Sequence, residues 1–269
     1  MSKIKVGAVV YAPQVTVIWG IIADYFKEAG MEIETVFFKD YRSQDKALLD
    51  GEVDIIWNSP LAFVECDIKS NSKATYSYMR DTDQDRTSCF LTKKDSGIKT
   101  TEDLRGKTIG FGAVDSPQAR LIPIQHLREN GLEYNKDYKE VTFDVALGLD
   151  GDHEGGEYDA LEALRRGEVD ACVTTDNNRR SWELSGKLDP NQIIVCSTTG
   201  LYDHCIFSVR EGFPKDLLEK WEQILSAMDY NNPKHKEMMD MEGLKKWVPG
   251  RRSGFTLLEK AVDYLKYFD

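Results

Sequence analysis

Two short segments of the chain place histidine beside acidic side chains. Residues 151–157 read GDHEGGE, and residues 202–205 read Tyr-Asp-His-Cys directly before an apolar, strand-like run. Imidazole and carboxylate groups exchange protons near neutral pH, and they also bind Zn, Fe, Mn or Cu. The sequence therefore predicts that His153, Glu157 and His204 belong to one site.

Three interpretations of this set stay open from the residues alone. The side chains could act as catalytic acids and bases or contact a ligand, with Asp115 or Asp203 orienting a histidine through its second ring nitrogen. They could bind a divalent metal, although no recognised ligand spacing is present. They could also be solvated loop residues that only cap turns. The paired glycines at 155 and 156 would let the first segment bend toward a common centre.

Bulk properties exclude some protein classes. The 269-residue chain has a net charge of −11, which argues against nucleic acid as a partner. It contains no apolar run long enough to span a membrane. The N-terminus lacks the features of a secretory signal, and the five cysteines are widely spaced in apolar runs, as reduced thiols would be. We expect a cytoplasmic protein as written, or a periplasmic or extracellular one if a signal peptide has been removed.

Strand-like and helix-like segments alternate along the first two thirds of the chain. Such alternation predicts an α/β protein in which helices flank mostly parallel sheets. The segment 45–59 (DKALLDGEVDIIWNS) closely resembles 159–176 (DALEALRRGEVDACVTTD), so we expect two similar lobes. After residue 209 the pattern predicts only helices. The acidic run at 79–86 lacks the glycine and distal glutamate of a calcium loop, and is interpreted as a solvated crossover.

Three segments carry a resemblance to a known family. Residues 40–64, 86–127 and 158–177 resemble the substrate-binding proteins of phosphonate and phosphite ABC transporters, the PhnD-like proteins. The resemblance implies a type 2 periplasmic-binding fold with two α/β lobes, two crossover segments and a ligand held between the lobes. It places the first lobe at 1–84 and 206–269, and the second at 85–205. The implied partners are a small polar or anionic molecule and possibly an ABC permease.

The same resemblance, together with the positions of strand ends, selects candidate ligand-binding residues. In open α/β sheets, ligands bind beyond the carboxyl ends of the strands, and helix N-termini there attract anions. The candidates are Tyr11, Tyr41, Asn58, Ser59, Asp115, Ser116, Gln118, Tyr158, Asp176, Asn177 and Tyr202.

The expected anion-binding turn differs from that of the family. A Ser-Thr-Ser type triplet is replaced here by Asp115-Ser116-Pro117, and Tyr158 stands where the family has histidine. Pro117 removes an N–H donor, and the Asp115 carboxylate repels a dianion. We therefore expect methylphosphonate and phosphite to bind weakly, with dissociation constants above about 1 mM.

The second function to consider is enzymatic. A cytoplasmic enzyme built on the same fold, either a lyase or decarboxylase or a catalyst of metal-assisted chemistry, would use His153, Glu157, His204 and Asp115. No cofactor is certain from the sequence, and a divalent metal is possible.

Overall fold

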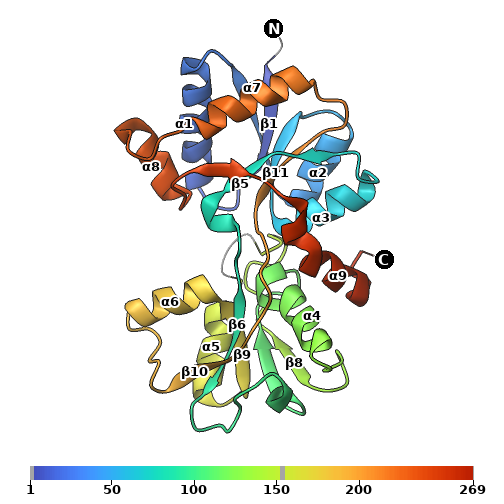
Figure 1. Ribbon diagram of the computed structural model, residues 1–269, viewed down its shortest axis with the longest axis vertical. Helices are drawn as coiled ribbons and strands as arrows, with labels where there is room; N and C mark the ends of the chain where they lie inside the picture. Colours follow the sequence, from blue (N-terminus) through green and yellow to red (C-terminus); the bar gives the residue numbers. More distant parts are fainter. Residues whose placement is uncertain (1–2, 152–154, 269) are drawn as a thin grey trace. The chain divides into compact units, whose positions relative to one another are not determined.

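The computed structural model describes residues 3–151 and 155–268 of the chain. The chain forms two compact units, and each is described separately below (Figure 1). The first unit joins Met1–Gln84 to Asp203–Ser253, and the second joins Asp85–Tyr202 to Gly254–Asp269.

The first unit is built on a five-stranded sheet with the order β2-β1-β3-β11-β4. Strands β1, β2 and β3 are parallel, whereas β11 runs antiparallel to β3 and to β4. The bounds of these strands are β1 Ile4–Val9, β2 Ile33–Phe38, β3 Ile55–Asn58, β4 Thr75–Tyr76 and β11 Ile206–Val209. The helices of this unit are α1 Gln14–Glu28, α2 Tyr41–Leu49, α3 Pro60–Lys69, α7 Lys215–Ser226 and α8 Pro233–Met241.

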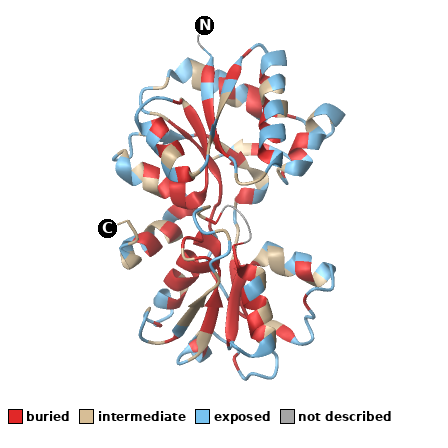
Figure 2. Cartoon of the chain, turned by 180° about the vertical axis from the view of Figure 1, so that it is seen from behind, coloured by how far each residue is buried: buried red, intermediate tan, exposed pale blue. Residues whose placement is uncertain are grey.

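Phe207 on β11 lies at the centre of the aromatic core of the first unit. Its ring contacts four tryptophan rings at centroid distances of 4.6 to 6.2 Å, and β11 is buried along its whole length; Figure 2 colours buried residues red. The four are Trp19, Trp57, Trp221 and Trp247. Large aromatic side chains bury much apolar surface, so this cluster fixes the position of β11 and of the residues just before it.

The second unit has a sheet with the order β10-β6-β9-β7-β8. Its strands are β6 Ser88–Lys93, β7 Thr108–Phe111, β8 Lys139–Thr142, β9 Ala171–Thr175 and β10 Ile193–Thr198. Its helical segments are a short 3-10 turn at Glu102–Leu104, a π-helical turn at Pro117–Leu121 that continues into α4 Ile122–Glu129, α5 Glu157–Arg166, α6 Asp176–Leu184 and α9 Thr256–Leu265.

The two sheets share one strand order, as the repeated segments predict. The order β2-β1-β3-β11 of the first unit matches β8-β7-β9-β6 of the second, including which strand is antiparallel. Each sheet is mixed, with four strands running in one direction and one strand, β11 or β6, running against them. Strands β6 and β11 are the first strands formed after the chain changes unit, so no right-handed β-α-β connection obliges them to run parallel.

The C-terminal segment differs from the sequence expectation. Residues 254–269 pack with the second unit, and 203–205 with the first, whereas we expected all of 206–269 in the first lobe and 85–205 in the second. Helix α9 packs against α4, where Arg128 lies 4.0 Å from the centre of the Tyr264 ring. Hydrophobic periodicity predicts that α9 has an apolar face to bury, but it does not predict which unit that face packs against.

The stretch after residue 209 is also not purely helical. Strand β12 (Trp247–Pro249) pairs antiparallel with β5 (Tyr78–Arg80). A strand of three residues is too short to show an alternating pattern, so periodicity could not predict it.

All five cysteines are free and buried, as predicted. Burial raises the pKa of the Cys89 thiol to about 12, so it stays protonated and unreactive. Within the described part of the chain, every helix is too short or too polar to cross a membrane.

Gly156 occupies a backbone position that only glycine fits. Its φ is +73°, and an added Cβ would overlap the carbonyl oxygen of Phe143. Gly131 has a similar φ of +79° but open space around it. We expect Gly131→Ala to cost about 1 kcal/mol of unfolding free energy from backbone strain alone, and Gly156→Ala to cost about 3 kcal/mol or more because a clash is added. Urea denaturation measures both, and equal losses would contradict the steric explanation.

The environment of His126 on α4 predicts that the folded protein loses stability in mild acid. Burial lowers its pKa below the usual 6.5, and its Nε2 lies 2.8 Å from the Ser197 hydroxyl. The imidazole of His126 therefore takes up a proton more readily in the unfolded chain than in the folded protein. As the pH falls below about 6.5, this difference lowers the free energy of unfolding. We expect His126→Gln to flatten the fall in melting temperature between pH 7 and 5. Parallel curves for the two proteins would contradict this assignment.

Candidate functional site

In the first unit, Asn58 and Ser59 end strand β3 and begin helix α3. The Ser59 hydroxyl oxygen caps the helix by accepting from Ala62 N–H at 3.2 Å. The Asn58 amide donates to the Ser208 hydroxyl at 3.1 Å and accepts from the Gln44 side chain at 3.0 Å. Asn58 thus joins two strands and a helix, while the Ser59 hydroxyl hydrogen can still be donated to a ligand.

The two tyrosines predicted to stack on ligand in this unit differ in exposure. Tyr41 is 2% exposed and packs with Val9 and Ala62, so its ring is part of the core. Tyr11 is half-buried and packs at the edge of the main hydrophobic cluster. Of the pair, only Tyr11 presents ring surface to solvent.

In the second unit, Ser116 begins the helical segment that follows strand β7. Its hydroxyl oxygen accepts from Ala119 N–H at 3.1 Å. The Gln118 side chain donates to the Gly151 carbonyl at 2.6 Å, and a Cβ on Gly151 would come within 2.6 Å of Gln118 Oε1. The loop residue Gly151 therefore lies directly against this helix start.

Asp115 ties the same loop to strand β7. One carboxylate oxygen accepts from Gly148 N–H at 2.6 Å and from Asp150 N–H at 3.2 Å. The other oxygen, Oδ1, is buried and accepts no hydrogen bond from the described residues, and the residue is 5% exposed. A buried carboxylate oxygen without a donor is costly, so this position favours a ligand group that donates a hydrogen bond.

Glu157 is a structural bridge rather than a group directed at solvent. It is fully buried, and Oε2 accepts from the Thr174 hydroxyl at 2.6 Å, Thr175 N–H at 3.0 Å and the Asn178 amide at 2.8 Å. These bonds join the starts of α5 and α6 to the end of β9. Thr175 in turn caps α6 by accepting from Asn178 N–H at 3.1 Å.

The remaining candidates in this unit are engaged with neighbouring residues. The Tyr158 ring packs on Trp182 at 5.4 Å, and Asp176 pairs with Arg179 at 2.7 Å. Asn177 is exposed, whereas Tyr202 is buried with its hydroxyl 2.8 Å from that of Ser88. Of these, Asn177 and Asp176 retain polar atoms that face solvent.

The three-residue set predicted from the sequence is not tested as a whole. His153 lies outside the described residues, Glu157 belongs to the second unit, and His204 belongs to the first. A single site made of these three residues therefore stays a prediction.

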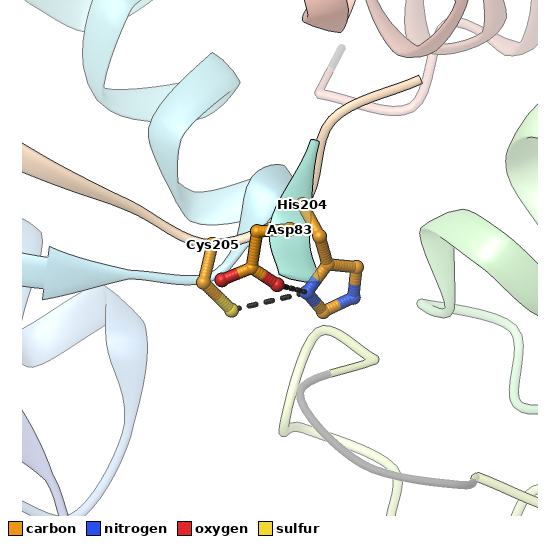
Figure 3. Close-up of side chains that lie close together, drawn as sticks. All are labelled: Asp83, His204 and Cys205. Atoms are coloured by element: carbon orange, nitrogen blue, oxygen red, sulfur yellow. Dashed lines mark hydrogen bonds and ion pairs between the residues drawn. The ribbon is translucent and has the colours of Figure 1, made fainter. Parts of the chain in front are cut away.

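His204 instead lies beside Asp83 and Cys205, a grouping that the sequence did not reveal (Figure 3). His204 Nδ1 is 3.1 Å from Cys205 Sγ and 3.7 Å from Asp83 Oδ1. The His204 N–H also donates to the Asp83 carbonyl at 2.9 Å. All three residues are buried, and these groups could hold a metal ion.

The interpretation of residues 79–86 as a solvated crossover was wrong for Asp83. Its side chain is fully buried because Arg80 compensates its charge, with Nε to Oδ2 at 2.6 Å and Nη2 to Oδ1 at 3.1 Å. Arg80 also pairs with Glu242 at 3.0 Å and lies over the Trp57 ring at 5.3 Å. Burial raises the pKa of Glu242, and the Arg80 charge partly offsets that rise.

The comparisons with known proteins decide the family. The family model described as ABC transporter, phosphonate, periplasmic substrate-binding protein matches residues 8–255. This chain belongs to that family.

Individual relatives agree with this assignment. A probable ABC transporter phosphite binding protein of Prochlorococcus marinus is 22% identical over 251 residues, covering 87% of this chain and 79% of that protein. A solved structure of PhnD1 from the same organism, in complex with methylphosphonate, has a TM-score of 0.70 at 16% identity, covering 98% of each chain. An uncharacterised protein of Haemophilus influenzae is 64% identical over 31 residues, which are 12% of this chain and 44% of that protein.

The contacts of His204 bear on the enzymatic alternative within this family. A nucleophilic Cys-His-Asp relay needs the two partners on opposite ring nitrogens, because one nitrogen takes the proton while the other is held by the carboxylate. In this substrate-binding protein both partners lie next to Nδ1, and Figure 3 shows the second nitrogen on the far side of the ring. The described contacts therefore do not form a proton relay to Cys205.

Removing the Arg80 charge tests the buried ion pairs. Arg80→Met would leave Asp83 buried without its counter-charge, and we expect a loss of about 3 to 5 kcal/mol in unfolding free energy. Lys46→Met breaks the exposed pair with Asp50 and should leave the stability unchanged within error. Chemical denaturation of both variants provides the measurement. A loss for Arg80→Met no larger than that of the Lys46 control would show that the buried pairs contribute nothing.

Proposed function

We propose that this protein captures a small phosphonate-type anion and delivers it to an ABC permease. The family supports this proposal, as does the relative whose structure holds methylphosphonate. The family is described as periplasmic, so we further propose that the protein works in the periplasm. Fractionation of the native organism with an antibody against this chain would test that location.

The observation that supports this proposal is a set of three helix N-termini, each capped by a hydroxyl side chain. Ser59, Ser116 and Thr175 each follow a parallel strand, and each uses its hydroxyl oxygen to accept from the first turn of a helix. This arrangement leaves the hydroxyl hydrogen available to donate to an oxyanion, and the helix dipole adds a favourable potential. Tetrahedral oxyanions have several acceptor oxygens and suit such donors.

Asp115 narrows the class of ligand. Its buried Oδ1, which accepts no hydrogen bond within the described ranges 3–151 and 155–268, lies on the residue next to Ser116, so a bare phosphonate dianion bound there would be repelled. A phosphonate that carries an ammonium or hydroxyl donor would instead satisfy this oxygen. We therefore propose that the preferred ligand combines an anionic phosphonate with a nearby hydrogen-bond donor.

Calorimetry with three probes tests the proposal: methylphosphonate, phosphite and aminomethylphosphonate. We expect the amino compound to bind most tightly to the unmodified protein. Asp115→Asn should tighten methylphosphonate binding about tenfold or more, because about 1.4 kcal/mol of repulsion corresponds to tenfold in affinity, and should weaken binding of the amino compound. Ser116→Ala should weaken binding of all three.

The exposed Asp95 supplies a charge-matched control, since Asp95→Asn should change none of these affinities. Micromolar binding of methylphosphonate by the unmodified protein would reject the role given to Asp115. Absence of binding for every probe in every variant would reject phosphonate capture itself.

The described contacts of Glu157 and His204 do not support the enzymatic alternative. Glu157 is saturated with structural hydrogen bonds at Oε2, and His204 lacks the relay geometry described above. The catalytic roles of His153, Glu157, His204 and Asp115 remain predictions. Detection of a reaction product formed from one of the bound probes would support them.

A further inference from the structure

We propose that Asp83, His204 and Cys205 form a zinc-binding site in the first unit, separate from the phosphonate-binding groups. Each residue offers one atom of a type that binds Zn²⁺: a carboxylate oxygen, an imidazole nitrogen and a thiolate sulfur. The set mixes nitrogen and sulfur with a single oxygen. That composition favours Zn²⁺ over Mg²⁺ or Ca²⁺, which prefer oxygen ligands.

The two distances from His204 Nδ1 to the other ligand atoms are close to the edge length of a tetrahedral zinc site. Zinc bond lengths of about 2.0 to 2.3 Å place the ligand atoms of a tetrahedral site about 3.3 to 3.8 Å apart. His204 Nδ1 lies 3.1 Å from Cys205 Sγ and 3.7 Å from Asp83 Oδ1, and all three atoms lie within 4.8 Å of one another. Small side-chain rotations would suffice to bind the ion, and the fourth position would take water.

Surrounding residues hold the three ligands in place without the ion. Arg80 bonds both oxygens of the Asp83 carboxylate, which orients it as outer partners orient metal ligands. The His204 backbone is fixed by its bond to the Asp83 carbonyl. Cys205 immediately precedes strand β11, whose Phe207 is held by the tryptophan cluster. The site is therefore largely preorganised.

The charges of the buried side chains in this region would sum to zero with a bound dication. Arg80 contributes one positive charge, and the Asp83 and Glu242 carboxylates contribute two negative charges. A Cys205 thiolate adds a third, so one Zn²⁺ makes the buried cluster neutral. The thiol proton must leave when the metal binds, which gives about one proton released per ion.

The site would link two segments that are distant in the sequence. Asp83 lies just before Gln84, where the chain leaves the first unit, and His204 and Cys205 follow Asp203, where the chain returns. Zinc would cross-link these two segments inside the first unit and should raise its resistance to unfolding.

Metal binding by the full chain tests the inference directly. The probes are Zn²⁺ and Co²⁺ alone, added both to chelator-treated native protein and to protein refolded from urea in their presence, because the cluster is buried. We expect about one ion per chain by at least one route, a thiolate-to-Co²⁺ charge-transfer band, about one proton released, and a higher melting temperature with Zn²⁺.

Matched variants assign the ligands. Cys205→Ser and His204→Gln should each weaken Zn²⁺ binding by more than about 100-fold, beyond the loss typical of outer-shell changes, and Cys205→Ser should abolish the charge-transfer band. Cys196→Ser and His126→Gln replace a buried cysteine and a half-buried histidine of the second unit and should leave binding unchanged.

Two results would overturn the site. One is the absence of stoichiometric metal in the unmodified protein by both routes, a measurement that does not depend on any variant folding. The other is a charge-transfer band that survives in Cys205→Ser. Calorimetry with phosphonates is a separate readout, so failure of either proposal leaves the other testable.

Discussion

The buried guanidinium of Arg80 compensates the charges that gather where the chain leaves and re-enters the first unit. Without it, Asp83 and Glu242 would be two carboxylates in a region of low dielectric, a state that proteins avoid by pairing or protonation. Because Arg80 fixes Asp83, the Asp83 backbone can accept from His204 and bring the second crossing segment alongside the first. Asp203 is held in the same region by Arg251, through two bonds of 2.7 Å.

The two sheets show how a repeated sequence segment becomes a repeated architecture. In each unit the motif GEVD leads into a central parallel strand, β3 or β9, and a hydroxyl residue, Ser59 or Thr175, then caps the following helix. Each cap uses the oxygen lone pair and leaves a hydrogen that points away from the helix bond. The same local device thus builds the fold and, in the function we propose, would supply donors for an anion, as suits a family described as phosphonate-binding.

Asp115 is the residue to which we assign the ligand preference of this chain. It occupies the turn after β7, and its bonds to Gly148 and Asp150 hold a loop against the Ser116 helix start. An ionised carboxylate accepts hydrogen bonds and repels anions, so in the function we propose it would change which ligands are electrostatically tolerated. Fold and specificity would then rest on different residues of the same turn, as expected when binding sites are built onto a shared scaffold.

The sequence by itself determined the element types, the two-unit repeat and the family, because hydrophobic periodicity, helix caps and the GEVD echo are local signals. It also placed Ser59 and Ser116 at helix starts. Only the tertiary structure decided that α9 packs in the second unit, that β12 pairs with β5, and that His204 lies beside Asp83 and Cys205. Those outcomes depend on contacts between residues far apart in the chain, where burial of a charge or an apolar face selects one partner among several that the local pattern allows.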